Sequence, residues 1–158
     1  DPRRYALTLG VHILGGGMSS RLFQKVREER GLTYSVFATR GVFEDAGVVS
    51  IYAGTAPDRA EELAAVVAQE VAEIADHGIT EEELAIARSG FEGSLLLGLE
   101  DTGSRMRRLG SNQLLTGTVM PLQELVEAFR AVTVAEINQA LAEVFSVDAV
   151  TTQVGPNS

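Results

Sequence analysis

The most informative segment of this chain is LGGGMSSRLFQKVREERGLTYSV, residues 14–36. Its three successive glycines favour an interruption of regular structure, because glycine loses more conformational entropy in a helix or strand than other residues and populates turns readily. The dense apolar residues before them, from Tyr5 to Leu14, fit a helix or a strand about equally by periodicity. The Asp1-Pro2 start and the glycine stop favour a helix, so we expect one that ends at the glycine run.

A second helix is expected directly after the glycines. Ser19 or Ser20 can cap its start, and the apolar residues that follow recur on one face as far as Arg30. Gly31 is the type of residue that ends a helix in a left-handed conformation. The residues of the apolar face are Leu22, Phe23 and Val26.

Two β-strands are predicted next, at residues 32–40 and 47–54, because both segments are rich in Val, Ile, Tyr, Phe and Thr. The short stretch between them, residues 44–47, has the composition of a hairpin connection. The two strands are therefore expected to be antiparallel neighbours.

Helices dominate the rest of the chain. Thr80 with Glu83, and Thr133 with Glu136, have the spacing of capping boxes that open helices. Further helices are expected at residues 57–77, around residues 106–115 and at residues 121–129, and a final strand at residues 147–154. This order predicts a single α+β domain over residues 1–158, with a mainly antiparallel sheet packed on a layer of helices.

Composition and charge exclude several function classes. The 158 residues contain no cysteine, which rules out a disulfide scaffold, a thiol nucleophile and an iron–sulfur cluster. The net charge is −9, with +4 over residues 1–40 and −13 over residues 41–158, so nucleic acid is not an expected partner. No apolar run approaches the roughly 20 residues of a membrane span, so a membrane is not an expected partner either.

The glycine run and the two histidines carry little chemistry by themselves. The glycines fit neither a dinucleotide fingerprint nor a phosphate-binding loop, and a tight helix-to-helix turn explains them. His12 and His77 lie far apart in the sequence, and neither has a partner at the spacing of a zinc-binding helix. No metal site is therefore expected within this chain.

Arg27 and Tyr34 are the most interesting polar pair. The predicted turn at Gly31 folds the strand that carries Tyr34 back beside the helix that carries Arg27. A guanidinium and a phenol are suitable donors for a peptide carbonyl or an oxyanion. Taken alone, the residues allow a second interpretation, in which Arg27 pairs with a neighbouring Glu and Tyr34 is half-buried in the sheet.

The quoted stretch closely resembles the second, non-metal-binding half of the pitrilysin-type zinc peptidases, which include the mitochondrial processing peptidase and insulin-degrading enzyme. The resemblance extends over essentially the whole chain. Further segments that resemble this family are ITEEEL at 79–84, LED at 99–101, AVTVAEI at 131–137 and VGP at 154–156.

The resemblance implies a mechanism in which two homologous halves enclose a chamber. The first half binds zinc through a His-x-x-Glu-His helix and a distant Glu, and the second half supplies an Arg and a Tyr seven residues apart. Arg27 and Tyr34 match that pair, so Arg27 is expected to anchor a substrate carbonyl and Tyr34 to donate to the developing oxyanion. The resemblance also suggests that Gly15, Gly16 and Gly17 contact the peptide substrate.

The departures from the family pattern define which part of the enzyme this would be. The chain has no His-x-x-Glu-His motif, and the strand that normally begins such a half-unit is absent. We therefore expect a processing-peptidase-like C-terminal half trimmed at its start, with zinc bound by an N-terminal zinc-binding half or partner subunit. The alternative is a non-catalytic structural or pairing subunit of the same family.

The absent first strand also has consequences for assembly. It should leave a sheet edge open, which predicts a homodimer through that edge. We expect a soluble protein of bacterial type, cytoplasmic rather than exported, although the lack of cysteine is compatible with either compartment.

Overall fold

A computed structural model describes residues 1–43 and 45–156 of the chain. The described part contains one antiparallel sheet of two strands, β1 (Ser35–Val42) and β2 (Gly47–Gly54). A π-helical turn, η1 (Phe23–Glu28), precedes the sheet and a 3-10 turn, η2 (Pro57–Arg59), follows it. The α-helices are α1 (Arg4–Gly15), α2 (Ala60–His77), α3 (Glu81–Gly98), α4 (Thr102–Thr116), α5 (Leu122–Ala131) and α6 (Val134–Phe145).

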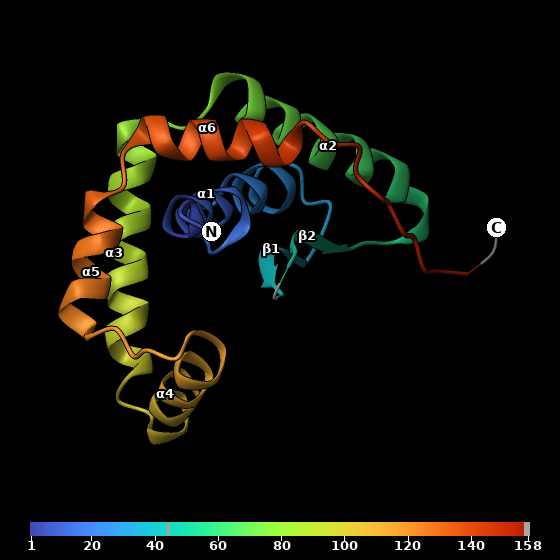
Figure 1. The fold of residues 1–158 in the computed structure, drawn as a ribbon. Coiled ribbons are helices and arrows are strands. Elements are labelled where there is room, and N and C mark those ends of the chain that lie inside the picture. Colours follow the sequence, from blue (N-terminus) through green and yellow to red (C-terminus); the bar gives the residue numbers. More distant parts are fainter. Residues whose placement is uncertain (44, 157–158) are drawn as a thin grey trace.

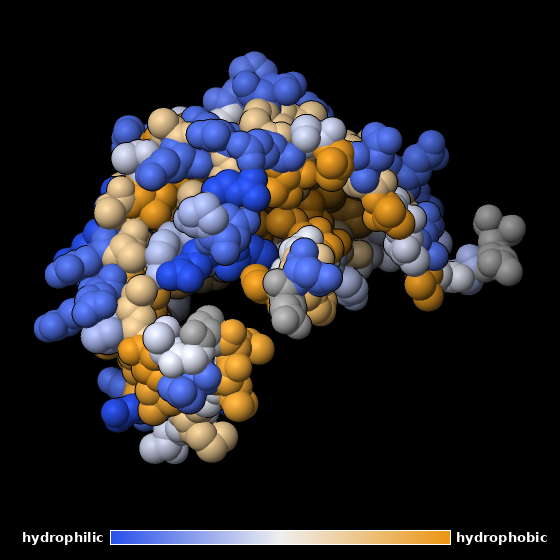
Figure 2. All heavy atoms as spheres, viewed as in Figure 1, coloured by the Kyte–Doolittle hydropathy of each residue, from blue (hydrophilic) through white to orange (hydrophobic). Residues whose placement is uncertain are grey.

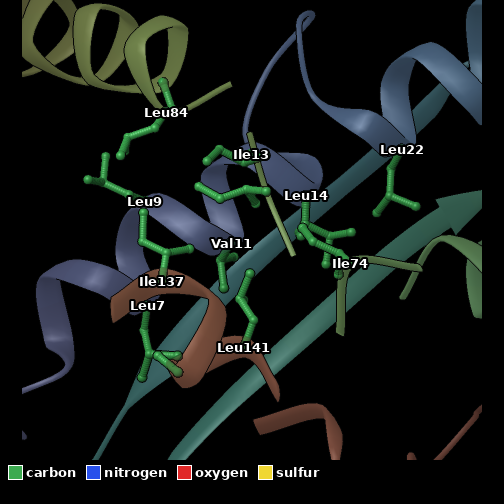
Figure 3. Close-up of a cluster of buried hydrophobic side chains, with 14 of the residues drawn as sticks. Leu7, Leu9, Val11, Ile13, Leu14, Leu22, Ile74, Leu84, Ile137 and Leu141 are labelled. Atoms are coloured by element: carbon green, nitrogen blue, oxygen red, sulfur yellow. The ribbon is translucent and has the colours of Figure 1, made fainter. Parts of the chain in front are cut away.

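Helix α1 is the centre of the core, and its prediction from the sequence is confirmed. It packs against β1, α3, α5 and α6, which explains why it is apolar around most of its circumference. Leu9 and Leu14 of α1 are completely buried. Figure 3 shows Leu84 from α3 and Ile137 from α6 beside Leu9, and Ile74 from α2 beside Leu14.

The predicted N-termini of α3 and α6 are also confirmed. Thr80 and Glu83 form a reciprocal capping box at α3, and Thr133 and Glu136 form the same motif at α6. Gly78, which ends α2, has φ of +72°, a conformation that favours glycine. These ends fix the corners where α2 meets α3 and where α5 meets α6 (Figure 1).

The hairpin is antiparallel as predicted, although its connection includes residue 44, which lies outside the described residues. Val36 and Ala38 of β1 are buried on the face that packs against α1. Phe37 alternates with them and lies opposite Tyr52 of β2 on the other face. Register and alternation therefore define an inner face and a solvent-facing outer face. The α+β class is confirmed in a helix-rich form.

The predicted final strand at residues 147–154 is wrong. This segment follows α6 as an extended, exposed stretch without strand pairing, and its valines Val147, Val150 and Val154 face solvent. A strand exists only where a neighbour accepts its backbone hydrogen bonds, and neither β1 nor β2 pairs with this segment. Its composition therefore favours a strand, but neither strand of the sheet pairs with the segment.

Candidate functional site

A sharp turn between η1 and β1 carries both predicted site residues. Arg27 lies in the last turn of η1, and the chain reverses at Gly31, which has φ of +57°. The Gly31 amide donates to the Arg27 carbonyl at 3.0 Å, and the Leu32 amide donates to the Val26 carbonyl at 2.9 Å. These bonds fold the chain back, so Arg27 and Tyr34 stand on the two arms of one turn.

Two side chains from beyond the hairpin hold this turn. The Arg59 guanidinium donates to the Gly31 carbonyl at 2.8 Å, and the Thr55 hydroxyl donates to the Leu32 carbonyl at 2.6 Å. Both residues come from the connection between β2 and α2. The backbone of the turn is therefore fixed by the element that follows the sheet, which no local pattern around Gly31 indicated.

Tyr34 has a fixed backbone and a free side chain. The buried Thr33 hydroxyl accepts a hydrogen bond from the Ser35 amide at 3.0 Å and contacts the Gly54 carbonyl of β2. The Tyr34 side chain, in contrast, is 92% exposed. This contradicts the alternative that Tyr34 is half-buried in the sheet. A phenol held in this way is ready to donate to a ligand that approaches from solvent.

Arg27 is supported by a neighbouring ring. Its guanidinium carbon lies 4.7 Å from the centre of the Phe23 ring, which is cation–π geometry. The Arg27 Nε also lies 3.8 Å from a carboxylate oxygen of Glu28, with both side chains largely exposed. An exposed pair at that distance contributes little, so the ring orients Arg27 while its donors remain accessible.

The glycine run divides into two closely packed glycines and one open glycine. A Cβ added to Gly15 would lie 2.5 Å from the backbone nitrogen of Ala38, so Gly15 allows α1 and β1 to approach closely. Gly16 and Gly17 are both exposed in the turn after α1. An added Cβ at Gly16 would nevertheless collide with His12, whereas at Gly17 it would have no neighbour closer than 3.9 Å. The structure thus supports a tight helix-to-helix turn, and contact between these glycines and a substrate stays a prediction.

The serines after the glycine run do not act as predicted. The Ser20 hydroxyl donates backward to the Gly17 carbonyl at 2.6 Å instead of accepting from the following helix. The Glu29 amide bonds to the Gln24 carbonyl, five residues earlier, at 2.9 Å. The expected regular helix therefore contains a wider π turn, a feature that occurs frequently at functional sites.

The start of this helical segment is anchored by a partly buried ion pair that the sequence did not reveal. Arg21 donates to both carboxylate oxygens of Glu83, at 2.6 and 3.0 Å, and to the Gly78 carbonyl at 2.7 Å. Burial opposes ionisation of Glu83, but hydrogen bonds from Arg21 and Thr80 outweigh it and hold the pKa of Glu83 below its ordinary value. The capping box indicated Glu83, whereas nothing local indicated Arg21.

The histidines occupy separate places. His77 is the last residue of α2, and its Nδ1 lies 3.6 Å from Oε1 of Glu73 on the same helix. His12 is half-buried in α1, and burial lowers its pKa. In residues 1–43 and 45–156, no three His, Asp or Glu side chains gather in a way that could hold a metal ion. Within the same residues, no helix is long and apolar enough to cross a membrane.

Comparison with known proteins agrees with this architecture. The chain is 37% identical over 156 residues to an uncharacterised zinc protease of Streptomyces coelicolor, a match that covers 99% of this chain and 34% of that protein. It is 37% identical to the uncharacterised zinc protease YmxG of Bacillus subtilis, over 98% of this chain and 38% of that protein. The chain thus spans little more than a third of the length of these curated relatives.

Solved structures have the same fold. A peptidase M16 inactive domain from Pseudomonas fluorescens superposes with a TM-score of 0.77 at 30% identity, over 90% of this chain and 34% of that one. A protease from Helicobacter pylori superposes with a TM-score of 0.76 at 20% identity, over 90% of this chain and 34% of that one. Residues 1–91 match the family described as the peptidase M16 inactive domain, and this stretch includes both Arg27 and Tyr34. The chain belongs to the peptidase M16 inactive domain family.

Proposed function

We propose that this chain is the substrate-binding half of a zinc metalloendopeptidase that hydrolyses peptides or small proteins in a chamber formed with a zinc-binding half. The observation that carries this proposal is the 92% exposed Tyr34 on a clamped backbone, on the same turn as the accessible guanidinium of Arg27. The names of the relatives, zinc proteases in both Streptomyces and Bacillus, support the same reaction class.

The two side chains suit complementary tasks on one peptide. A guanidinium offers several fixed donors and can hold a substrate carbonyl, which positions the backbone. A phenol donates one hydrogen bond, and a donor aimed at an oxygen that gains negative charge lowers the barrier to hydrolysis. Arg27 therefore orients the peptide and Tyr34 stabilises the oxyanion, while zinc is assigned to the partner half because the described residues gather no ligands for it.

A non-catalytic pairing role is the second candidate, and helix α4 favours it. None of the side chains described in α4 is buried, and several large apolar ones face solvent. Figure 2 shows them as an apolar cluster over this helix. Such a cluster is typical of a surface that contacts another protein. The exposed residues are Met106, Leu109, Leu114 and Leu115.

The role of Arg27 is tested in the parent protein by peptide hydrolysis. Arg27→Ala should lower kcat/KM by about 100-fold, because a charged hydrogen bond to the substrate is lost. Arg27→Lys should recover only part of the lost kcat/KM, because an ammonium lacks the planar arrangement of donors that a guanidinium has. Arg30→Ala, on the same exposed segment, is the matched control and should stay within about twofold of wild type.

The zinc content of each variant is measured with its kinetics. It should equal that of wild type, because Arg27 is not assigned to the metal. Arg27→Ala with wild-type kcat/KM would remove the substrate role. A folded, zinc-loaded parent that hydrolyses no peptide would favour the pairing role.

A further inference from the structure

Two aromatic side chains are stacked on the outer face of the hairpin. Phe37 of β1 and Tyr52 of β2 are directly opposite in the register, with ring centres 5.1 Å apart and planes 26° apart. The two residues are 42% and 55% exposed. Stacked rings on a two-stranded ribbon form a flat, rigid apolar surface, which we call the aromatic platform.

In the described residues, the hydrophobic core covers only the inner face of the sheet, opposite the platform. Val36 and Ala38 point toward α1 and are buried, so the platform does not contribute to the main core. Figure 1 shows α1 lying along one side of the hairpin and no helix against the other. The platform is therefore not explained by the packing of the described residues.

The outer face carries no charge along its whole length. The alternation of the strands places only small, hydroxyl-bearing or apolar residues beside Phe37 and Tyr52. A charged side chain would find no partner on such a face, whereas an apolar one would lose its hydration shell against two rings. The other outer-face residues are Ser35, Thr39, Gly41, Val48, Ser50 and Gly54.

The platform lies close to the proposed catalytic turn along the chain, because β1 begins directly after Tyr34. Phe37 follows Tyr34 by three residues, which corresponds to about 10 Å along an extended chain. A substrate in extended conformation, with a carbonyl at Tyr34, covers the same length with three of its own residues. We propose that Phe37 and Tyr52 form a subsite for a large apolar or aromatic side chain of the peptide substrate, an inference that rests on the proposed function.

A peptide library tests this subsite in the parent protein. One Phe is moved through every position of a background of Ala and Ser, and kcat/KM is measured for each peptide. Wild type should prefer Phe at one position by about tenfold over Ala. Phe37→Ala and Tyr52→Ala should reduce that preference to about twofold. Thr39→Ala, on the same outer face, is the matched control and should keep the full preference.

The possible results separate this inference from the proposed function. If wild type hydrolyses peptides without a preference for Phe, or if that preference persists in both Phe37→Ala and Tyr52→Ala, the proposed subsite is wrong. The proposed peptidase function is not affected by either result. If wild type hydrolyses no peptide, the proposed function fails. The subsite is then decided by NMR on the labelled 158-residue chain. A Phe-containing peptide should shift the signals of Phe37 and Tyr52, its Ser counterpart should not, and equal spectra would overturn the subsite.

Discussion

Gly15 shows how one residue can determine the approach of two elements. A methyl group there would meet the backbone nitrogen of Ala38, which cannot move without displacing β1. Gly15→Ala should therefore lower the free energy of unfolding by about 1–3 kcal/mol, as overpacking does. At Gly17 an added Cβ has no neighbour closer than 3.9 Å. Gly17→Ala should therefore change the free energy of unfolding by less than about 0.5 kcal/mol. Urea denaturation of both variants measures this difference, and equal stabilities would contradict it.

Glu83 should make stability depend on pH in the acid range. Its pKa lies below the ordinary value of 4.5, so its contribution is complete above that pH and disappears as the pH falls through the lowered pKa. Glu83→Gln should be less stable than wild type by about 1–3 kcal/mol at pH 7, and the gap should close in acid. Glu81→Gln, at an exposed position of the same helical turn, is the control. A gap for Glu83→Gln that is constant from pH 7 to pH 3 would contradict the ionic role.

The candidate site residues Arg27 and Tyr34 could be chosen from the sequence, but the residues that support their turn could not. The spacing of Arg27 and Tyr34 around Gly31 predicted that a turn joins them, because glycine punctuation is a local signal. Arg59 and Thr55 hold that turn from beyond β2, and their role depends on a contact across more than twenty residues. Such contacts leave no mark in local periodicity.

At the scale of elements, burial separates α6 from α4. Leu141 of α6 is completely buried, whereas Leu114 of α4 is 86% exposed. Leu141→Ala should cost about 2–5 kcal/mol of unfolding free energy, because it opens a cavity beside α1. Leu114→Ala removes the same atoms from solvent-exposed surface and should cost less than about 0.5 kcal/mol. Thermal and urea denaturation of both variants test this contrast, and a comparable loss in Leu114→Ala would show that α4 packs against the core.

Elements with local end signals were predictable, and those that need a distant partner were not. The capping boxes at Thr80 and Thr133 identified two helix starts because both partners lie within four residues. Residues 147–154 have the composition of a strand, but pairing depends on a neighbouring edge that composition does not describe. The π turn at η1 was missed for a similar reason, since its hydrogen-bond shift has no sequence signature here.

At the scale of the whole molecule, the sheet of two strands leaves backbone groups at its edges. In the described part of the chain, β1 and β2 pair only with each other. Unpaired edges favour association with another strand, so we propose that the isolated chain forms a homodimer through a sheet edge. Light scattering over a range of concentrations should show a mass that rises toward twice 16.9 kDa. A constant monomer mass at high concentration would contradict this.

We propose that this half presents donors to a peptide while a zinc-binding half holds the metal, and Tyr34→Phe in the parent protein tests this proposal. The substitution removes one hydroxyl from a side chain that is 92% exposed, so folding and zinc content should not change. Loss of an oxyanion donor should lower kcat by about 100-fold or more. A Tyr34→Phe parent with normal zinc content and a kcat within about twofold of wild type would show that Tyr34 does not stabilise the oxyanion.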